Sequence, residues 1–351
     1  MSCKGFDEQV VRLDKEIADL THQFVLARIT NMRGVDLNQF DFDYDLTWTG
    51  FFMNAGGKVY GRFGGRDGKV ADAQLTLTGL KHAMREALAA YRQEPNAPAE
   101  RLTKAISRAE DYPSAAKRKP DSCIHCHNVY DFDRDNLVKT GQWSKDRVWV
   151  YPPPRNIGVT LDKDQQNRIE AIAPGSAAAQ GGLHAGDLLR TVGGRSVASF
   201  ADVQYALHRA PASGQLPVTA ERAGKPLPVT LTLAPGWREG DLTWRESMWS
   251  IPPNASVYGK DLTPEEKQAL GLSPRALAFR QGDFVPRAAA QAGIKGKDII
   301  LGLDDRPLEM TMLQFNVYIR LNFKVGERVT YAVLRDGQRL KIPVTLQQRD
   351  F

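Results

Sequence analysis

One sequence feature constrains the fold of this chain more than any other: a segment that occurs twice, 111 residues apart. The first copy, Gly175–Leu189, reads GSAAAQGGLHAGDLL, and the second, Pro286–Ile300, reads PRAAAQAGIKGKDII. The two copies share a run of small residues, then a glycine, then an aspartate followed by an aliphatic residue, all at matching positions. The spacing is too long for a solenoid, whose repeats run about 20–50 residues. The repeat therefore indicates two copies of one domain.

Composition places the chain among ordinary globular proteins. A length of 351 residues with 42% hydrophobic content suits two to four domains. No apolar run approaches the roughly 18 residues of a membrane span, so none is predicted. The net charge is +6, but acids and bases are interleaved. The one basic cluster, Lys117–Lys119, lies in a proline-bearing linker, so no nucleic-acid partner is predicted.

The first copy carries a longer pattern, A-P-G-S-x-A-x-x-x-G-L-x-x-G-D-x-L at residues 173–189. This pattern resembles bacterial PDZ domains of the kind appended to periplasmic proteases, over residues 155–234. We expect Ala177–Ala179 to form a short helix that ends at Gly182, because glycine suits a helix terminus. A strand at Leu188–Val192 and a helix at Phe200–His208 should follow.

The PDZ resemblance also implies a function. PDZ domains bind an extended peptide as an added strand at a sheet edge, and a backbone nest holds its terminal carboxylate. Asn156–Val159 resembles the loop and strand beside that groove, so Ile157, Gly158 and Val159 are the predicted peptide-binding residues and peptide C-termini the predicted partners. The alternative is a PDZ fold kept as a packing module with a blocked groove, and this stays open above all for the second copy. The chain contains no G-x-S-x-G or G-N-S-G-G, so proteolysis is not predicted.

The first 92 residues show alternating helix and strand signals. Apolar residues at helical spacing predict a helix over residues 4–22, and Phe24–Ile29 reads as a short buried strand. Trp48–Met53 and Lys58–Phe63 read as two strands joined by a turn at Asn54–Gly57. A second helix is expected around residues 80–91. The predicted order is α-β-β-β-α.

This region resembles a thioredoxin-like domain that begins partway through its active site. Cys3-Lys4 followed by a helix matches the second cysteine of the C-x-x-C motif, and the run Thr30–Leu37 resembles bacterial thioredoxin-like (seleno)proteins with PDZ domains, found mostly in planctomycete-type bacteria. The resemblance implies that Cys3 is the resolving cysteine and that the nucleophile, selenocysteine or cysteine, precedes Met1. It also implies that the protein with that residue is a thiol or selenol oxidoreductase.

The run Cys123-Ile124-His125-Cys126-His127 spells C-x-x-C-H, the haem attachment sequence of c-type cytochromes. On this resemblance Cys123 and Cys126 bind haem c covalently, and His127 ligates the haem iron. Two alternatives stay open: a zinc site, which needs four ligands, and a redox disulfide between the two cysteines. The distal ligand is undetermined among five candidates: Met32, Met53, His82, His184 and His208.

These inferences combine into one prediction. The fold class is multi-domain, α/β plus mainly-β: a truncated thioredoxin-like domain (1–92), a linker with the Cys/His connector (93–154), a PDZ domain (155–234), a linker (235–257) and a PDZ-like domain (258–351). The predicted function is thiol or selenol redox coupled to electron transfer by haem c, with an unknown redox partner. The alternative is a non-enzymatic PDZ scaffold whose Cys/His segment is a disulfide or zinc site. No signal peptide is visible, yet the resemblances imply a periplasmic or otherwise extracytoplasmic location.

Overall fold

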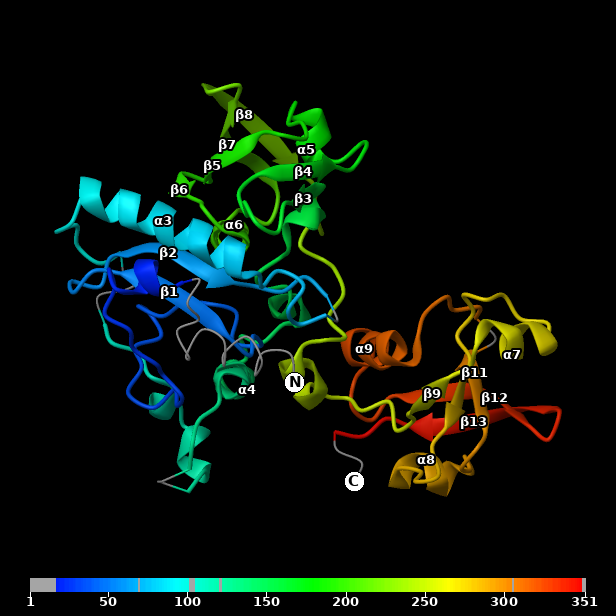
Figure 1. The fold of residues 1–351 in the computed structure, drawn as a ribbon. Coiled ribbons are helices and arrows are strands. Elements are labelled where there is room, and N and C mark those ends of the chain that lie inside the picture. The colour runs from blue at the N-terminus through cyan, green and yellow to red at the C-terminus, as the bar shows by residue number, and fades with distance from the viewer. Residues whose placement is uncertain (1–16, 69, 101–104, 120–121, 305, 349–351) are drawn as a thin grey trace. The chain divides into compact units, whose positions relative to one another are not determined.

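A computed structural model describes residues 17–348, except 69, 101–104, 120–121 and 305 (Figure 1). The chain divides into two compact units, residues 1–240 and 241–351. Each is described by itself. The fold is mixed α/β, with several small antiparallel sheets.

The N-terminal part of the first unit contains a hairpin covered by one long helix (Figure 1). Strands β1 (Thr49–Met53) and β2 (Val59–Gly64) pair antiparallel, and the Asn54–Gly57 turn closes on hydrogen bonds between Asn54 and Lys58. These predictions are confirmed. The expected second helix is α3 (Leu77–Gln93), whose Thr76 cap accepts from the Gly79 N–H. Phe63 is fully buried, and Leu80, Ala83 and Met84 of α3 belong to the same apolar cluster.

The prediction of a buried strand at Phe24–Ile29 is wrong. In the structure these residues form neither helix nor strand, and Val25 is 99% exposed. An apolar run becomes a buried strand only when a neighbour pairs its backbone and covers its side chains. The described part of residues 1–92 holds α2 (Ala18–Thr21), one hairpin and α3, so a thioredoxin-like domain is not shown. Cys3 lies outside the described residues, as does most of the helix predicted over 4–22.

The middle segment is helical and irregular. It contains the short 3-10 turns η1 (Ala109–Asp111), η2 (Ala115–Lys117) and η3 (Lys145–Val148), and the helix α4 (Cys126–Lys139). Ile124, Val129 and Phe132 pack with Met32 and Leu37 into a second apolar cluster. The C-x-x-C-H run therefore sits at the start of a helix that contacts a filled core.

The first copy of the repeat follows. Its elements are η4 (Pro154–Ile157), β3 (Val159–Leu161), β4 (Ile169–Ile172), α5 (Ala177–Gln180), β5 (Leu188–Val192), β6 (Arg195–Ser196), α6 (Phe200–His208), β7 (Gly214–Arg222) and β8 (Lys225–Leu233). Strands β3 and β4 form one sheet, and a second sheet has the order β6-β5-β7-β8. The predicted strand at Leu188–Val192 and helix at Phe200–His208 are confirmed residue for residue. Helix α5 ends at Gln180, two residues before Gly182, which takes a φ of +83°.

The second unit repeats this order of elements. Its elements are η5 (Glu246–Ser250), β9 (Gly259–Asp261), α7 (Pro264–Ala269), β10 (Phe279–Gln281), α8 (Arg287–Ala292), β11 (Ile299–Leu303), α9 (Met312–Asn322), β12 (Arg328–Arg335) and β13 (Gln338–Thr345). One sheet contains all five strands in the order β13-β12-β11-β10-β9. The main difference from the first copy is α7, inserted between the first two strands.

A buried aspartate performs the same structural task in both copies. Asp187 accepts the His184 N–H and two hydrogen bonds from Arg222, which also donates to the Gly182 carbonyl. The Arg222 hydrogen bond lowers the pKa of Asp187. In the second unit Asp298 accepts from the Lys295 N–H and from Arg335 at 2.7 Å. The aspartate that the two copies share thus supplies a buried carboxylate that ties a loop to the end of a strand.

None of the helices in the described part of the chain is both long enough and apolar enough to cross a bilayer.

Candidate peptide groove

Helix α6 forms one wall of the predicted groove. Ser199 caps it by accepting the Asp202 N–H at 3.0 Å. Val203, Ala206 and Leu207 face the core of the first copy. Helical spacing turns Gln204 and His208 to an adjoining side of the helix, away from Ala206. We call this side, with Gln204 and His208, the groove side of α6.

The predicted loop and strand form the other wall. Ile157 ends η4, Gly158 is left-handed with a φ of +87°, and Val159 begins β3. The Gly158 carbonyl accepts the Ala173 N–H, and Val159 pairs with Ile172. Antiparallel alternation therefore turns the backbone N–H and C=O of Val159 away from β4. Strand β3 pairs only with β4 among the described strands, so its other edge has no strand neighbour.

Contacts from the N-terminal hairpin cover the outer side of α6. Arg62 of β2 donates its backbone N–H to the Asp202 carboxylate at 2.9 Å, and its guanidinium lies 3.6 Å from the Tyr205 ring centroid. Burial raises the pKa of Asp202 to about 6, although Arg62 and the donors at Ala198 and Ser199 act to lower it. The hairpin and the repeat domain therefore share a buried ionisable contact.

We expect the unfolding free energy of the first unit to depend on pH through the ionisation of Asp202. Its folded pKa of about 6 lies above the unfolded value of about 3.9, so its contribution to stability is fully present below pH 4 and is lost as the pH rises through 6. The unfolding free energy of the wild type minus that of Asp202→Asn should fall by about 2 kcal/mol between pH 4 and 7. Urea unfolding of both proteins across this range measures it. A difference that stays constant with pH contradicts the assignment.

The structure also reveals a segment that sequence reasoning missed. The Tyr151 ring stacks on His208 with centroids 4.1 Å apart, and the Tyr151 carbonyl accepts from Gln204 at 3.1 Å. In the second unit Arg320, in the last turn of α9, donates to the carbonyls of Ile251 and Pro253. The signal was a second repeat, V-W-V-Y-P-P at 148–153 against M-W-S-I-P-P at 248–253. Each copy thus begins with a W-x-x-P-P segment docked on its long helix.

The cysteines of the C-x-x-C-H run lie in different environments. Cys123 is exposed, whereas Cys126 begins α4 and is half-buried against the apolar cluster of Ile124. Burial raises the pKa of the Cys126 thiol. The rings of His125 and His127 stack with centroids 6.0 Å apart. Both cysteines are free thiols in the structure.

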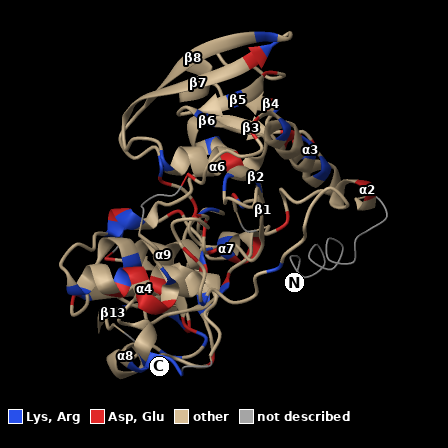
Figure 2. Cartoon of the chain, turned by 90° about the vertical axis from the view of Figure 1, so that its left-hand side faces the viewer, with Lys and Arg blue, Asp and Glu red and all other residues tan. Residues whose placement is uncertain are grey.

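Helix α4, which begins within this run, carries Asp131, Asp133 and Asp135 (Figure 2), and Arg118 donates to the Cys123 carbonyl at 3.4 Å. Tyr112 donates to Asp133 at 3.3 Å; burial raises the pKa of Tyr112 to about 12 and also raises that of Asp133. The described residues contain no group of three or more His, Cys, Asp or Glu side chains able to hold a metal ion, and the zinc alternative stays a prediction. Haem attachment through Cys123, Cys126 and His127 stays a prediction.

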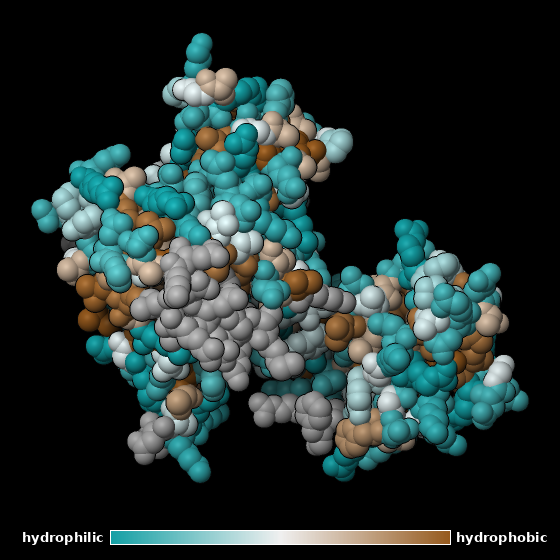
Figure 3. Space-filling model, viewed as in Figure 1, coloured by the Kyte–Doolittle hydropathy of each residue, from teal (hydrophilic) through white to brown (hydrophobic). Residues whose placement is uncertain are grey.

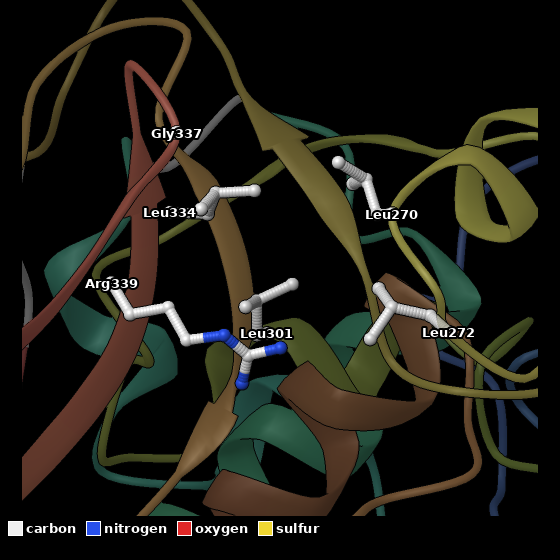
Figure 4. A pocket seen from close by; sticks show the side chains of 6 residues that line it. All are labelled: Leu270, Leu272, Leu301, Leu334, Gly337 and Arg339. Atoms are coloured by element: carbon white, nitrogen blue, oxygen red, sulfur yellow. The ribbon is translucent and has the colours of Figure 1, made fainter.

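A pocket of about 240 Å³ lies in the second unit, and none of its lining residues comes from β9 or α9. Leu270 and Leu272 follow α7, Leu301 and Leu334 come from β11 and β12, and Arg339 comes from β13 (Figure 4). Figure 3 shows apolar and hydrophilic surface interleaved on this unit. The pocket belongs to the sheet face rather than to the counterpart of the groove.

Comparison with known proteins identifies one domain. The PDZ domain family matches residues 168–222, so the chain contains a PDZ domain. A probable DegP-like periplasmic serine endoprotease of Hahella chejuensis is 22% identical over 54% of this chain and 40% of its own length. The periplasmic pH-dependent serine endoprotease DegQ of Escherichia coli is 25% identical over 41% of this chain and 29% of its own.

The chain spans at most 40% of the length of the curated relatives it matches. A crystal structure of the serine endoprotease from Yersinia pestis has a TM-score of 0.24 and 19% identity, covering 32% of this chain and 36% of that one. A similarity this weak supports no further argument.

The comparisons overturn the predicted main function. The relatives are periplasmic serine endoproteases, and the matched family is PDZ, so the prediction of a thiol or selenol redox protein with haem electron transfer is wrong. No match supports the thioredoxin-like resemblance. The predicted extracytoplasmic location is confirmed by the periplasmic relatives.

Proposed function

We propose that this chain is a docking protein of the extracytoplasmic space, whose PDZ domain binds extended polypeptide segments along β3. The observation that carries the proposal is the open edge of β3, with the backbone of Val159 turned outward. An extended peptide gains main-chain hydrogen bonds by pairing with such an edge. The left-handed Gly158 beside Ile157 supplies the backbone turn at which a terminal carboxylate would be held.

Residues 258–351 form, in this proposal, a second PDZ domain. Its support is the repeated order of elements and the Asp298–Arg335 contact, which reproduces the Asp187–Arg222 contact. Asp261 of β9 accepts the Met312 N–H at 2.7 Å, so strand and helix are already bridged here. A peptide would therefore enter the groove between strand and helix less readily in the second copy than in the first.

Hydrolysis is not part of the proposal. The endoprotease relatives share 40% or less of their length with this chain. The chain has no G-x-S-x-G motif. The PDZ family match supports docking, so docking is the activity that we propose for this chain.

Hydrogen exchange with mass spectrometry tests the proposal. The probes are synthetic peptides with apolar last residues, each prepared with a free and with an amidated C-terminus. We expect a bound peptide to slow exchange at Val159 and Leu161, and the free carboxylate to bind more tightly. Strand β8, also at a sheet edge, is the internal control and should not change. Failure of every peptide to protect β3, or equal protection of β8, contradicts the proposal.

A further inference from the structure

A segment from elsewhere in the chain contacts the groove side of α6 much as a peptide ligand would. Residues Gly65–Gly68, which we call the strap, follow β2 directly. The Arg66 N–H donates to Gln204 Oε1 at 3.2 Å, and Gln204 Nε2 donates to the Arg66 carbonyl at 2.9 Å. One side-chain amide thus pairs with both backbone groups of one residue. An extended peptide laid along a helix would be held in the same way.

The other end of the strap reaches the loop wall. Arg155 of η4 donates to the Asp67 carbonyl, and a Cβ atom at Gly68 would lie 3.9 Å from the Arg155 guanidinium nitrogens. Arg155 precedes the groove glycine Gly158 by three residues. The strap therefore runs from the helix wall to the loop wall of the groove, over residues that a peptide ligand would contact.

The sequence of the strap fits this position. Gly65 is buried and has a φ of +94°. A Cβ atom there would lie 2.5 Å from Gln204 Oε1 and 2.7 Å from Phe200 Cδ1. Arg66 Nε donates to the Gly68 carbonyl at 2.6 Å, which holds the strap in its bent form. Only glycine lets the backbone approach α6 this closely.

We infer that the strap is an intramolecular ligand of the PDZ groove, and that an external partner binds by displacing it. The inference rests on the proposed function. It also specifies part of the ligand: a glycine that approaches α6, followed by a residue whose N–H and C=O both pair with Gln204. Because the strap is tethered, its effective concentration is about 1 mM, so it weakens external binding without blocking it.

Fluorescence anisotropy of the whole chain tests the inference. The probe is a labelled synthetic peptide with the sequence of residues 62–69. We expect Gly65→Val to dislodge the strap and to bind this peptide at least about ten-fold more tightly than the wild type. Gly194→Ala is the matched control: Gly194 also has a positive φ, of +75°, but its Cβ would meet nothing within 4 Å. Equal affinity of all three proteins overturns the inference, and a probe with valine at the Gly65 position should bind none of them.

A second measurement does not depend on the variant folding. Exchange of the Arg66 amide in the wild type should be slow, because Gln204 accepts its hydrogen. A peptide that protects β3 should raise exchange at Arg66 at least about ten-fold. Protection of β3 with unchanged exchange at Arg66 overturns the inference but leaves the proposed function intact. Absence of any peptide binding contradicts the proposed function instead.

Discussion

Replacing Gly158 with alanine should destabilise the first unit by about 3 kcal/mol and abolish peptide binding along β3. Two costs add. A non-glycine residue in the left-handed region costs about 1–2 kcal/mol. The new Cβ would lie 2.0 Å from Ser176 Oγ, and overpacking of this kind costs about 1–3 kcal/mol. Ser176 cannot move freely, because its hydroxyl accepts the Ala179 N–H and caps α5.

Urea unfolding and hydrogen exchange measure the two effects of Gly158→Ala. Gly194→Ala, with open space around its Cβ, separates the conformational cost from the clash. Gly259→Ala should be equally severe in the second unit, since its Cβ would lie 1.8 Å from the Arg280 carbonyl oxygen. If Gly158→Ala lowers the unfolding free energy no more than Gly194→Ala does, the close approach of Gly158 to Ser176 does not determine the conformation of the loop.

The repeat domain was the most predictable part of the molecule. Its strand Leu188–Val192 and helix Phe200–His208 agree with the sequence-based bounds, because the signals that fix them are local. Ser199 is the helix cap, and the Gly186-Asp187 turn places the carboxylate that Arg222 binds. Such motifs determine nearby backbone geometry whatever the rest of the chain does.

The packing of the N-terminal hairpin and the strap on α6 could not be predicted in the same way. Arg62 and Asp202 are 140 residues apart, and Arg66 and Gln204 are 138 apart. No local pattern marks such pairs, since neither partner is unusual in its own segment. The strand expected at Phe24–Ile29 failed for a related reason: apolar composition predicts burial, but burial depends on a partner strand that the segment lacks.

The Cys/His run shows the limit of a short motif. C-x-x-C-H specifies residue types and spacing, yet the environment of each thiol depends on what packs between them. Ile124 is fully buried and its carbonyl accepts the Met32 N–H, which holds Cys126 against the core and leaves Cys123 exposed. Five residues that fit a motif therefore leave the chemistry of the segment open, since it depends on the packing around each thiol.

The second unit should lose most of its stability on Phe315→Ala, by about 3–5 kcal/mol. Phe315 is fully buried in α9, with its ring centroid 6.2 Å from that of Phe279 and 6.1 Å from that of Tyr331. Removing the ring leaves a cavity between the helix and the sheet, which rigid strands cannot fill. Phe284→Ala is the control, because Phe284 is 59% exposed and should cost less than about 0.5 kcal/mol. Hydrogen exchange with mass spectrometry measures the stability of the second unit separately from that of the first. Similar exchange rates in the two variants would contradict the contribution of Phe315 to this core.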